Sequence, residues 1–166
     1  MLKAIPNDLN IHPGWFKFKI YEDGQLIGQS VTTKFKFWRY LEIEMVLKTE
    51  QYAMQINQRQ ITSPEGIKLM KDSLCLASAS FLPGRLTSFL TIYDQGSFLL
   101  KRTIGRHFRV FKDNNEEVGK ISTGSILQYI FTCDLPNQIL LPIRTFMLQI
   151  VTLWWSGGYS ALSSAT

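Results

Sequence analysis

The chain has few of the residues from which catalytic and metal sites are usually built. Its 166 residues include only two histidines, His12 and His107, and two cysteines, Cys75 and Cys133. No Gly-x-Ser-x-Gly nucleophile turn, phosphate-binding loop or dinucleotide-binding glycine pattern is present. A histidine-based triad or metal site therefore lacks the residues it would need. The sequence predicts a protein that is not an enzyme and that uses no cofactor or metal.

Signals of secretion and of domain linkage are also scarce. Residues 1–13 contain no continuous apolar run of the kind that a secretory signal requires, so we expect a cytoplasmic protein. Both cysteines lie in apolar, strand-like segments, which predicts buried reduced thiols rather than a disulfide. Because no Pro/Ser-rich stretch divides the chain, we expect a single domain over 1–166. It would comprise a lead-in over 1–14, a core over 15–135, a terminal helix over about 138–156 and a loose tail over 157–166.

Only one long hydrophobic run occurs, from Ile139 to Trp155. As a helix it would be about 26 Å long, slightly short of a bilayer core of roughly 30 Å. A helix that is apolar on nearly every side suits burial inside the protein's own sheet, and a membrane span is the alternative. Arg144, near its start, is expected to reach solvent at a barrel mouth or a lipid headgroup. The uncharged polar residues form one stripe that could bond to surrounding groups: Gln138, Thr145, Gln149, Thr152 and Ser156.

The rest of the chain is rich in β-hairpin signals. The segment from Phe18 to Gly28 has an Asp-Gly turn between alternating apolar residues, and a similar unit recurs from Phe108 to Gly119 with one residue added at the tip. A weaker third copy spans Leu90 to Leu100. Asp-Gly and Asp-Asn pairs supply the positive φ that tight hairpin turns require. Each unit is predicted to be strand, turn, strand, with Gly28 and Gly119 at equivalent positions.

Alternation with period two predicts further strands. Val31 to Leu47 places apolar and polar residues on opposite faces, as one strand or two, and Ser125 to Cys133 is expected to be the last strand. Asp134 or Asn137 is expected to cap the helix that follows. The chain is thus predicted to be mainly β, with a single C-terminal helix.

These repeated Phe-x-(Ile/Val)-(Tyr/Phe)-x-Asp-Gly-x-x-(Ile/Val)-Gly hairpins, which lead into one hydrophobic helix, resemble the tubby C-terminal-like superfamily, especially its LURP-one-related and phospholipid scramblase branches. The resemblance covers most of the chain, from Phe16 to Trp155. It implies a closed antiparallel β-barrel of repeated hairpins that encloses the terminal helix. Tubby members bind phosphoinositide headgroups through basic side chains, and scramblases act at membranes. The cysteine-rich and Pro-rich segments typical of scramblases are absent, which argues against lipid translocation.

Positive charge is the main functional signal, with a formal net charge of +5. The segment 101–112 contains no acidic residue, so its basic residues predict an anion site, with a solvated strand face as the alternative. Alternation places neighbouring residues on opposite faces, so this segment cannot form one flat basic face unless a turn at Gly105 reverses the chain. The candidate headgroup ligands are Lys101, Arg102, Arg106 and Arg109, with Lys34, Lys36 and Arg39 from a second basic segment.

The second basic segment also bears on the kind of partner. Alternation sends Lys34, Lys36 and Trp38 to one face and Phe35 and Phe37 to the other. A nucleic-acid platform needs aromatics and cations together on one face, so this pattern argues against nucleic acid. Trp38 with its lysines would suit a membrane surface. We therefore expect a binding module for anionic phospholipid headgroups, cytoplasmic and peripheral at the membrane. The alternative is a structural or adaptor protein that binds another protein, with an incidental basic face.

Overall fold

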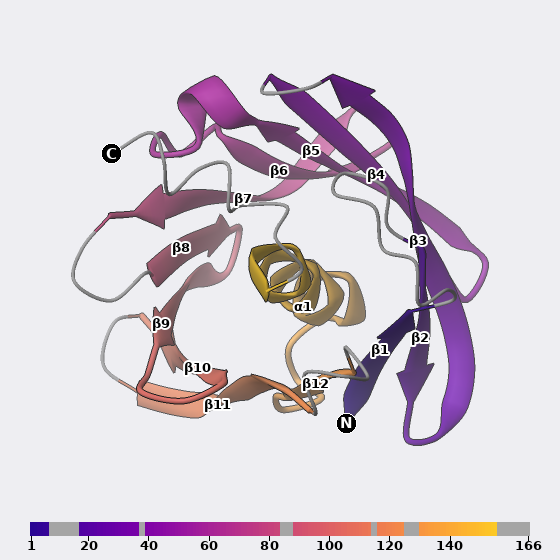
Figure 1. Cartoon of the computed structure of the whole chain (residues 1–166), viewed down its shortest axis with the longest axis vertical. Helices are drawn as coiled ribbons and strands as arrows, with labels where there is room; N and C mark the ends of the chain where they lie inside the picture. The colour runs from indigo at the N-terminus through magenta and orange to yellow at the C-terminus, as the bar shows by residue number, and fades with distance from the viewer. Residues whose placement is uncertain (7–16, 37–38, 84–87, 114–115, 125–129, 156–166) are drawn as a thin grey trace.

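The computed structural model describes residues 1–6, 17–36, 39–83, 88–113, 116–124 and 130–155. Twelve β-strands in these ranges form a closed antiparallel barrel around one α-helix, which confirms the predicted fold class (Figure 1). The elements in chain order are β1 (Leu2–Pro6), β2 (Lys17–Glu22), β3 (Gln25–Lys36), β4 (Tyr40–Leu47), β5 (Glu50–Asn57), a 3-10 turn (Gln58–Gln60), β6 (Ile67–Lys71), β7 (Leu74–Leu82), β8 (Ser88–Tyr93), β9 (Gly96–Arg102), β10 (His107–Lys112), β11 (Glu116–Thr123), β12 (Phe131–Asp134) and α1 (Leu141–Trp155).

Each strand pairs with the next along the chain, and β1 pairs with β12 to close the barrel. In this closing pair Leu2 lies opposite Cys133 and Ala4 opposite Phe131. The prediction that 1–14 only leads into the core is therefore wrong for β1. A strand of five residues with only two fully buried side chains gives too short an alternation to be recognised in sequence.

The predicted hairpin repeat is confirmed by strand register. Ile20 lies opposite Gly28 and Val110 opposite Gly119, and in both hairpins a β-bulge follows at once. A Cβ atom on Gly28 would lie 2.0 Å from the carbonyl oxygen of Val46, and one on Gly119 would lie 2.1 Å from that of Asp134. Both glycines are therefore required by the same close approach of the bulged strand to its neighbour.

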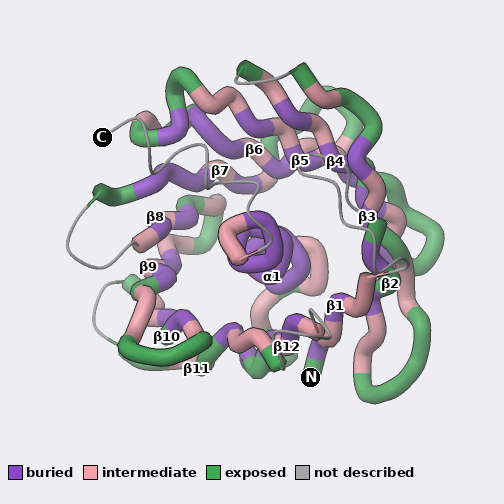
Figure 2. The backbone as a smooth tube through the Cα atoms, in the orientation of Figure 1, coloured by how far each residue is buried: buried purple, intermediate pink, exposed green. Residues whose placement is uncertain are grey.

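Helix α1 lies in the middle of the ring of strands (Figure 1). Every residue from Ile143 to Leu153 is buried, and the buried faces of the strands surround the helix (Figure 2). Near the end of the helix, Trp154 packs against Phe81 of β7 and Phe89 of β8, with ring centroids 5.9 Å apart in each pair. Burial inside the barrel is thus observed. No helix in the described part of the chain is long and apolar enough to cross a bilayer.

The polar stripe of α1 is only partly satisfied by the barrel wall. Gln149 donates from Nε2 to the Ser30 hydroxyl of β3 at 2.9 Å, as expected for a buried amide. Thr152 instead bonds back to the Leu148 carbonyl of its own helix at 2.8 Å. The Thr145 hydroxyl has no hydrogen-bond partner in the described structure. The bond from Gln149 to Ser30 thus links this stripe to the wall and constrains the rotation of α1.

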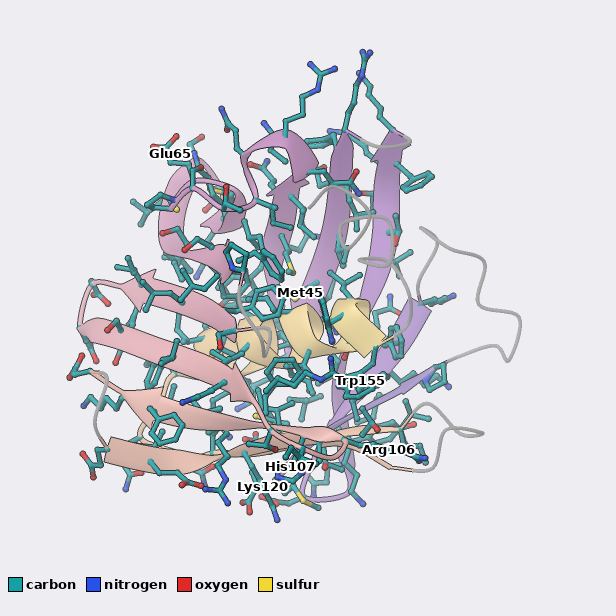
Figure 3. The ribbon with its side chains drawn as sticks, turned by 60° about the vertical axis from the view of Figure 1, so that its left-hand side comes forward. Met45, Glu65, Arg106, His107, Lys120 and Trp155 are labelled. Carbon is teal, nitrogen blue, oxygen red and sulfur yellow. The ribbon has the colours of Figure 1, made fainter. Side chains whose placement is uncertain are left out.

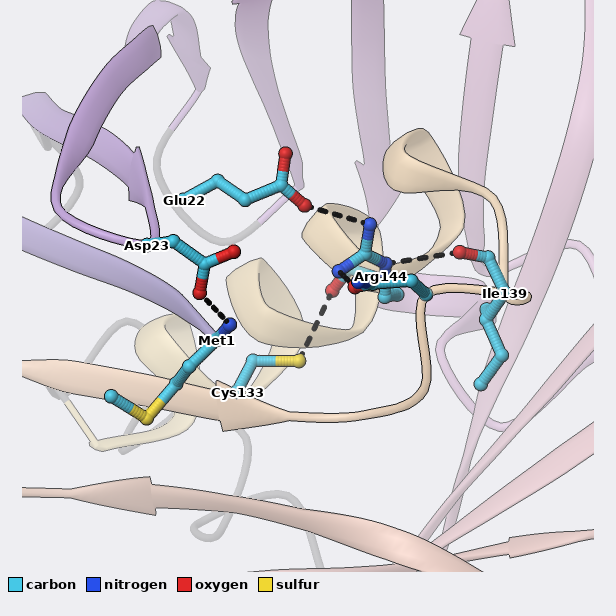
Figure 4. Close-up of polar contacts among 7 residues, drawn as sticks. Met1, Glu22, Asp23, Cys133, Ile139 and Arg144 are labelled. Carbon is cyan, nitrogen blue, oxygen red and sulfur yellow. Dashed lines mark hydrogen bonds and ion pairs between the residues drawn. The ribbon is translucent and has the colours of Figure 1, made fainter.

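The first turn of α1 is anchored by a buried arginine (Figure 4). Arg144 is 4% exposed, and its guanidinium contacts the Glu22 carboxylate at 2.9 Å, the Asn137 side-chain oxygen at 3.0 Å and the Ile139 carbonyl at 2.9 Å. The prediction that Arg144 reaches solvent is wrong, because Glu22, 122 positions away in sequence, neutralises it inside the barrel mouth. The helix begins at Leu141, so neither Asp134 nor Asn137 caps it.

Two smaller predictions are corrected. The last strand starts at Phe131 rather than at Ser125, and 125–129 lie outside the described residues. Both cysteines are free thiols, and Cys133 is buried as predicted, but Cys75 is exposed near the start of β7. Burial raises the pKa of the Cys133 thiol to about 12, so it is not a nucleophile.

Candidate basic binding site

The basic segment 101–112 forms a hairpin in which the chain reverses at Gly105. Gly105 has a φ of 134°, and Arg109 of β10 lies directly opposite Lys101 of β9. The next strand adds Lys120, which lies opposite Arg109. All three side chains are exposed on the outer face. Strand alternation predicts that Lys101 and Arg109 share one face and that Arg102 and Arg106 share the other. The turn places Lys101 and Arg109 on adjacent strands, whereas Arg102 ends β9 and Arg106 lies in the turn.

The charge of this outer row is partly compensated. Arg109 lies 3.6 Å from the Glu117 carboxylate of β11, in an exposed ion pair. Lys120 lies opposite Asp134 of β12 in the register. An exposed pair of this kind is worth little and is screened by salt, so it weakens the local positive potential without removing it.

Arg102 does not belong to the outer row. It lies opposite the buried Phe108, and its guanidinium sits 5.2 Å from the centre of the Trp155 ring at the end of α1. Its Nε is buried without a hydrogen-bond partner in the described structure. A cation next to the last turn of a helix is favoured by the helix dipole and by the aromatic face. Arg102 therefore lies off the outer row, as strand parity predicts, and its role as a headgroup ligand stays a prediction.

The second basic segment lies where β3 turns into β4. Lys34 is paired with Glu42 at 3.1 Å, while Lys36 and Arg39 are exposed and the Arg39 amide donates to the Lys36 carbonyl at 3.0 Å. The Tyr40 hydroxyl donates to the Glu42 carboxylate at 2.7 Å. This hydrogen bond, together with the nearby Lys34 ammonium, lowers the pKa of the Glu42 carboxyl. Phe37 and Trp38 lie outside the described residues.

Topology decides how these two segments relate. In an antiparallel barrel, successive connections alternate between the two ends. The connections that precede β4, β6 and β10 therefore lie at one rim, and those that precede β3, β5, β7, β9 and β11 lie at the other. We call the first the basic rim, because its described connections carry Lys36, Arg39, Arg59 and Arg106, all exposed. We call the second the acidic rim, because its turns carry Asp23, Glu50, Asp72, Asp94 and Asp113, all exposed.

The segregation of charge between the rims is strong but not complete. The basic rim has one described acidic residue in these connections, Glu65, which pairs with Lys68 at 3.6 Å. The acidic rim also carries Lys48, Lys71 and Lys112, and Lys71 is paired with Glu50 at 2.8 Å. The basic rim is wide: Figure 3 shows Arg106, His107 and Lys120 in one part of the molecule and Glu65 on the opposite side.

Two further exposed cations, Arg59 and Lys120, were not among the predicted headgroup ligands. Arg59 lies in the 3-10 turn between β5 and β6, and no other cation lies within its connection. Lys120 is one residue beyond the repeat motif. The alternation of connections between the two ends could have placed Arg59 at the basic rim, but only with the strand count known.

The described residues contain no cluster of three or more His, Cys, Asp or Glu side chains arranged to hold a metal ion. His107, the first residue of β10, is half-buried and its carbonyl accepts from the Thr103 hydroxyl at 3.1 Å. Comparison of the chain with protein-family models, with curated proteins and with solved structures gives no match. The site must therefore be interpreted from its own chemistry.

Proposed function

We propose that this protein binds anionic phospholipid headgroups at a membrane surface, with its basic rim facing the lipid. The observation that carries the proposal is the separation of charge between the two rims. A barrel with cations at one end and carboxylates at the other has a preferred orientation in the field of an anionic surface. Each basic residue held near such a surface contributes about 1 kcal/mol.

The freedom of the basic side chains supports the same proposal. Lys36, Arg39 and Arg106 are exposed and make no ion pair with any described residue, so they are available to phosphate groups. Between Arg102 and Arg106, the turn also presents Ile104, which is 95% exposed. An apolar tip flanked by cations suits the boundary between headgroups and acyl chains.

The fold agrees with the proposed family. A closed antiparallel barrel around a C-terminal helix is the architecture that the resemblance to tubby-like proteins implies, and we infer that the chain is a distant member. The proposed role is non-enzymatic and peripheral, on the cytoplasmic side of the membrane. The outer row of Lys101, Arg109 and Lys120 would add to the attraction but would not insert.

Flotation with lipid vesicles tests the proposal. The full chain should float with vesicles of phosphatidylcholine and phosphatidylserine, not with phosphatidylcholine alone, and high salt should release it. Arg39→Gln with Arg106→Gln on the basic rim should weaken binding by about thirtyfold. The matched control, Lys71→Gln with Lys112→Gln on the acidic rim, removes the same charge and should change binding little. Absent binding of the unmodified protein, or equal losses in both double variants, would overturn the proposal.

A second function is favoured by a separate observation on the acidic rim. Leu26, Leu74 and Leu140 are 58%, 65% and 52% exposed near turns that carry carboxylates. Exposed leucines bordered by acidic residues suit a basic, amphipathic protein segment. An adaptor role through this rim would survive the loss of all lipid binding. Asp72→Asn with Asp94→Asn, which removes two exposed carboxylates of the acidic rim, should then weaken capture of the basic partner.

A further inference from the structure

A groove of about 560 Å³ lies on the outer face of β2, β3 and β4, away from the basic rim. Its volume is within the range of small-ligand sites. The side chains and backbone that matter for its chemistry come from Lys19, Leu26, Ile27, Gly28, Val46 and Lys48.

The β-bulge of the first hairpin repeat lies in the lining of the groove. Ile20 lies opposite Gly28 and Tyr21 opposite Leu26, so Ile27 is the extra residue. Gly28 supplies no side chain, and its backbone lies so close to β4 that a Cβ atom would sit 2.0 Å from the Val46 oxygen. Gly28 thus allows β3 to lie against β4 at the bulge, and the bulge residues Ile27 and Gly28 both line the groove.

The lining combines apolar surface with two free cations. Leu26 is 58% exposed, and Ile27 and Val46 are half-buried beside it. Lys19 and Lys48 are exposed, and neither forms an ion pair with a described residue. The Lys48 amide donates to the Ile27 carbonyl at 2.6 Å, which holds this lysine at the edge of the groove. Apolar contacts beside uncompensated positive charge fit a molecule with an anionic head and an apolar chain.

The described residues of the second hairpin repeat have the same backbone register but lack the apolar lining and the unpaired cations of the first. Its register places Arg109 where the first repeat has Lys19, and Glu117 where it has Leu26. It also places Asp134 where the first repeat has Val46. Two carboxylates therefore replace two apolar residues, and Glu117 pairs with Arg109 at 3.6 Å. The combination of an apolar lining and free cations is specific to the first repeat.

We propose that this groove binds a single-chain anionic amphiphile, with its carboxylate or phosphate between Lys19 and Lys48 and its first methylene groups on Leu26, Ile27 and Val46. A fatty acid and a lysophospholipid share this chemistry. The site does not rest on the proposed membrane function, because it uses neither the basic rim nor a bilayer.

The test is a nuclear magnetic resonance titration of the full, isotope-labelled chain with decyl phosphate or decanoate below the micelle concentration. Saturable shifts are expected at the amides of 26–29 and 46–48. Inorganic phosphate and decyl maltoside should bind at least about tenfold more weakly, because each offers only one half of the interaction. The stronger of the two anionic amphiphiles identifies the head group.

The hairpin repeat supplies the variants. Leu26→Glu copies the second repeat and should weaken binding by about tenfold or more, because it removes apolar contact and pairs with Lys19. Glu117→Gln, the control in the other repeat, should leave binding unchanged. Full-strength binding by Leu26→Glu, shifts confined to other surfaces, or equal binding of decyl maltoside or inorganic phosphate would overturn the proposal. The footprint on the unmodified chain decides the matter if Leu26→Glu fails to fold.

Discussion

Arginine is used in opposite ways at the two rims of the barrel. At the acidic rim, Arg144 is buried and bonded on all sides by Glu22, Asn137 and the chain. At the basic rim, Arg106 is exposed and has no ion pair with a described residue. Burial makes the first a structural group, since an unpaired charge inside the barrel would be costly, whereas the second costs little to remove. Exposed cations such as Arg106, whose removal costs the fold little stability, are therefore the candidates for ligand binding.

The N-terminus reinforces this contrast. The Met1 ammonium pairs with Asp23 at 2.7 Å, and the Asp23 amide donates to the Met1 carbonyl at 3.1 Å (Figure 4). The pKa of the Asp23 carboxyl is lowered, chiefly by its hydrogen bond to the chain terminus. Charges at the acidic rim thus hold β1 to the β2–β3 turn and help to close the barrel.

Helix α1 runs between the two rims and fills the core of the barrel, so its removal should have the largest effect on stability. A chain that ends at Leu135 loses the fully buried Phe146, Met147 and Ile150, each worth about 2–5 kcal/mol, against a typical total stability of about 5–15 kcal/mol. We expect an aggregating product with no cooperative thermal transition by circular dichroism. A monomeric truncated chain that melts cooperatively would show that the barrel does not depend on its helix.

The contrast between the two arginines predicts a large difference in stability. Arg144→Met should lower the free energy of unfolding by about 3–5 kcal/mol, because Glu22 is left without its partner. Arg106→Met should change it by less than about 0.5 kcal/mol. Denaturant titration measures both. Adding Glu22→Met to Arg144→Met should recover much of the loss, and failure to do so would assign the effect to packing rather than to charge.

Each rim has a tyrosine whose ionisation at alkaline pH should lower the stability of the fold. Tyr40 donates to Glu42 and Tyr52 donates to Glu50, and burial followed by these bonds raises the pKa of each tyrosine from 10.0 to about 12. Folding therefore favours the protonated phenols. This stabilisation should be complete below pH 10 and should be lost as the pH rises from 10 to about 12. Tyrosinate absorbance is measured against pH for the unmodified protein and for the Tyr40→Phe and Tyr52→Phe variants, and the signal that each variant lacks gives the pKa of the replaced tyrosine. Ionisation of either tyrosine near pH 10 in the native state would contradict the prediction.

The smallest effect is expected at the apolar tip of the basic rim. Ile104→Ser should weaken binding to anionic vesicles by about fivefold, because partial insertion of the side chain contributes about 1 kcal/mol. Leu74→Ser, at an exposed leucine of the acidic rim, is the control and should have no effect. Equal behaviour of the two variants in the flotation assay would mean that the rims do not differ in their approach to the membrane.

Much of the fold could be predicted from local patterns. Alternation and Asp-Gly turns identified the hairpins around Gly24 and Asp113, and the continuous apolar surface of 139–155 required burial on nearly every side. These features are local, since hairpin register is set within about a dozen residues. The candidate site was predictable only in part. Lys36, Arg39, Arg106 and Arg109 are exposed, as a basic outer face requires, but their division between the basic rim and the outer row was not predictable, and their role as ligands stays a prediction.

Sequence by itself therefore determined which segments form the repeated hairpins, where these hairpins turn, and that the terminal helix must be hidden. Tertiary structure alone decided that β1 closes the barrel, that Arg102 turns inward onto Trp155, and that Glu22 neutralises Arg144. The physical reason is that each of these outcomes depends on groups far apart in the chain. Burial and pairing of a charge are set by what barrel closure brings beside it, and neither spacing nor composition contains that information.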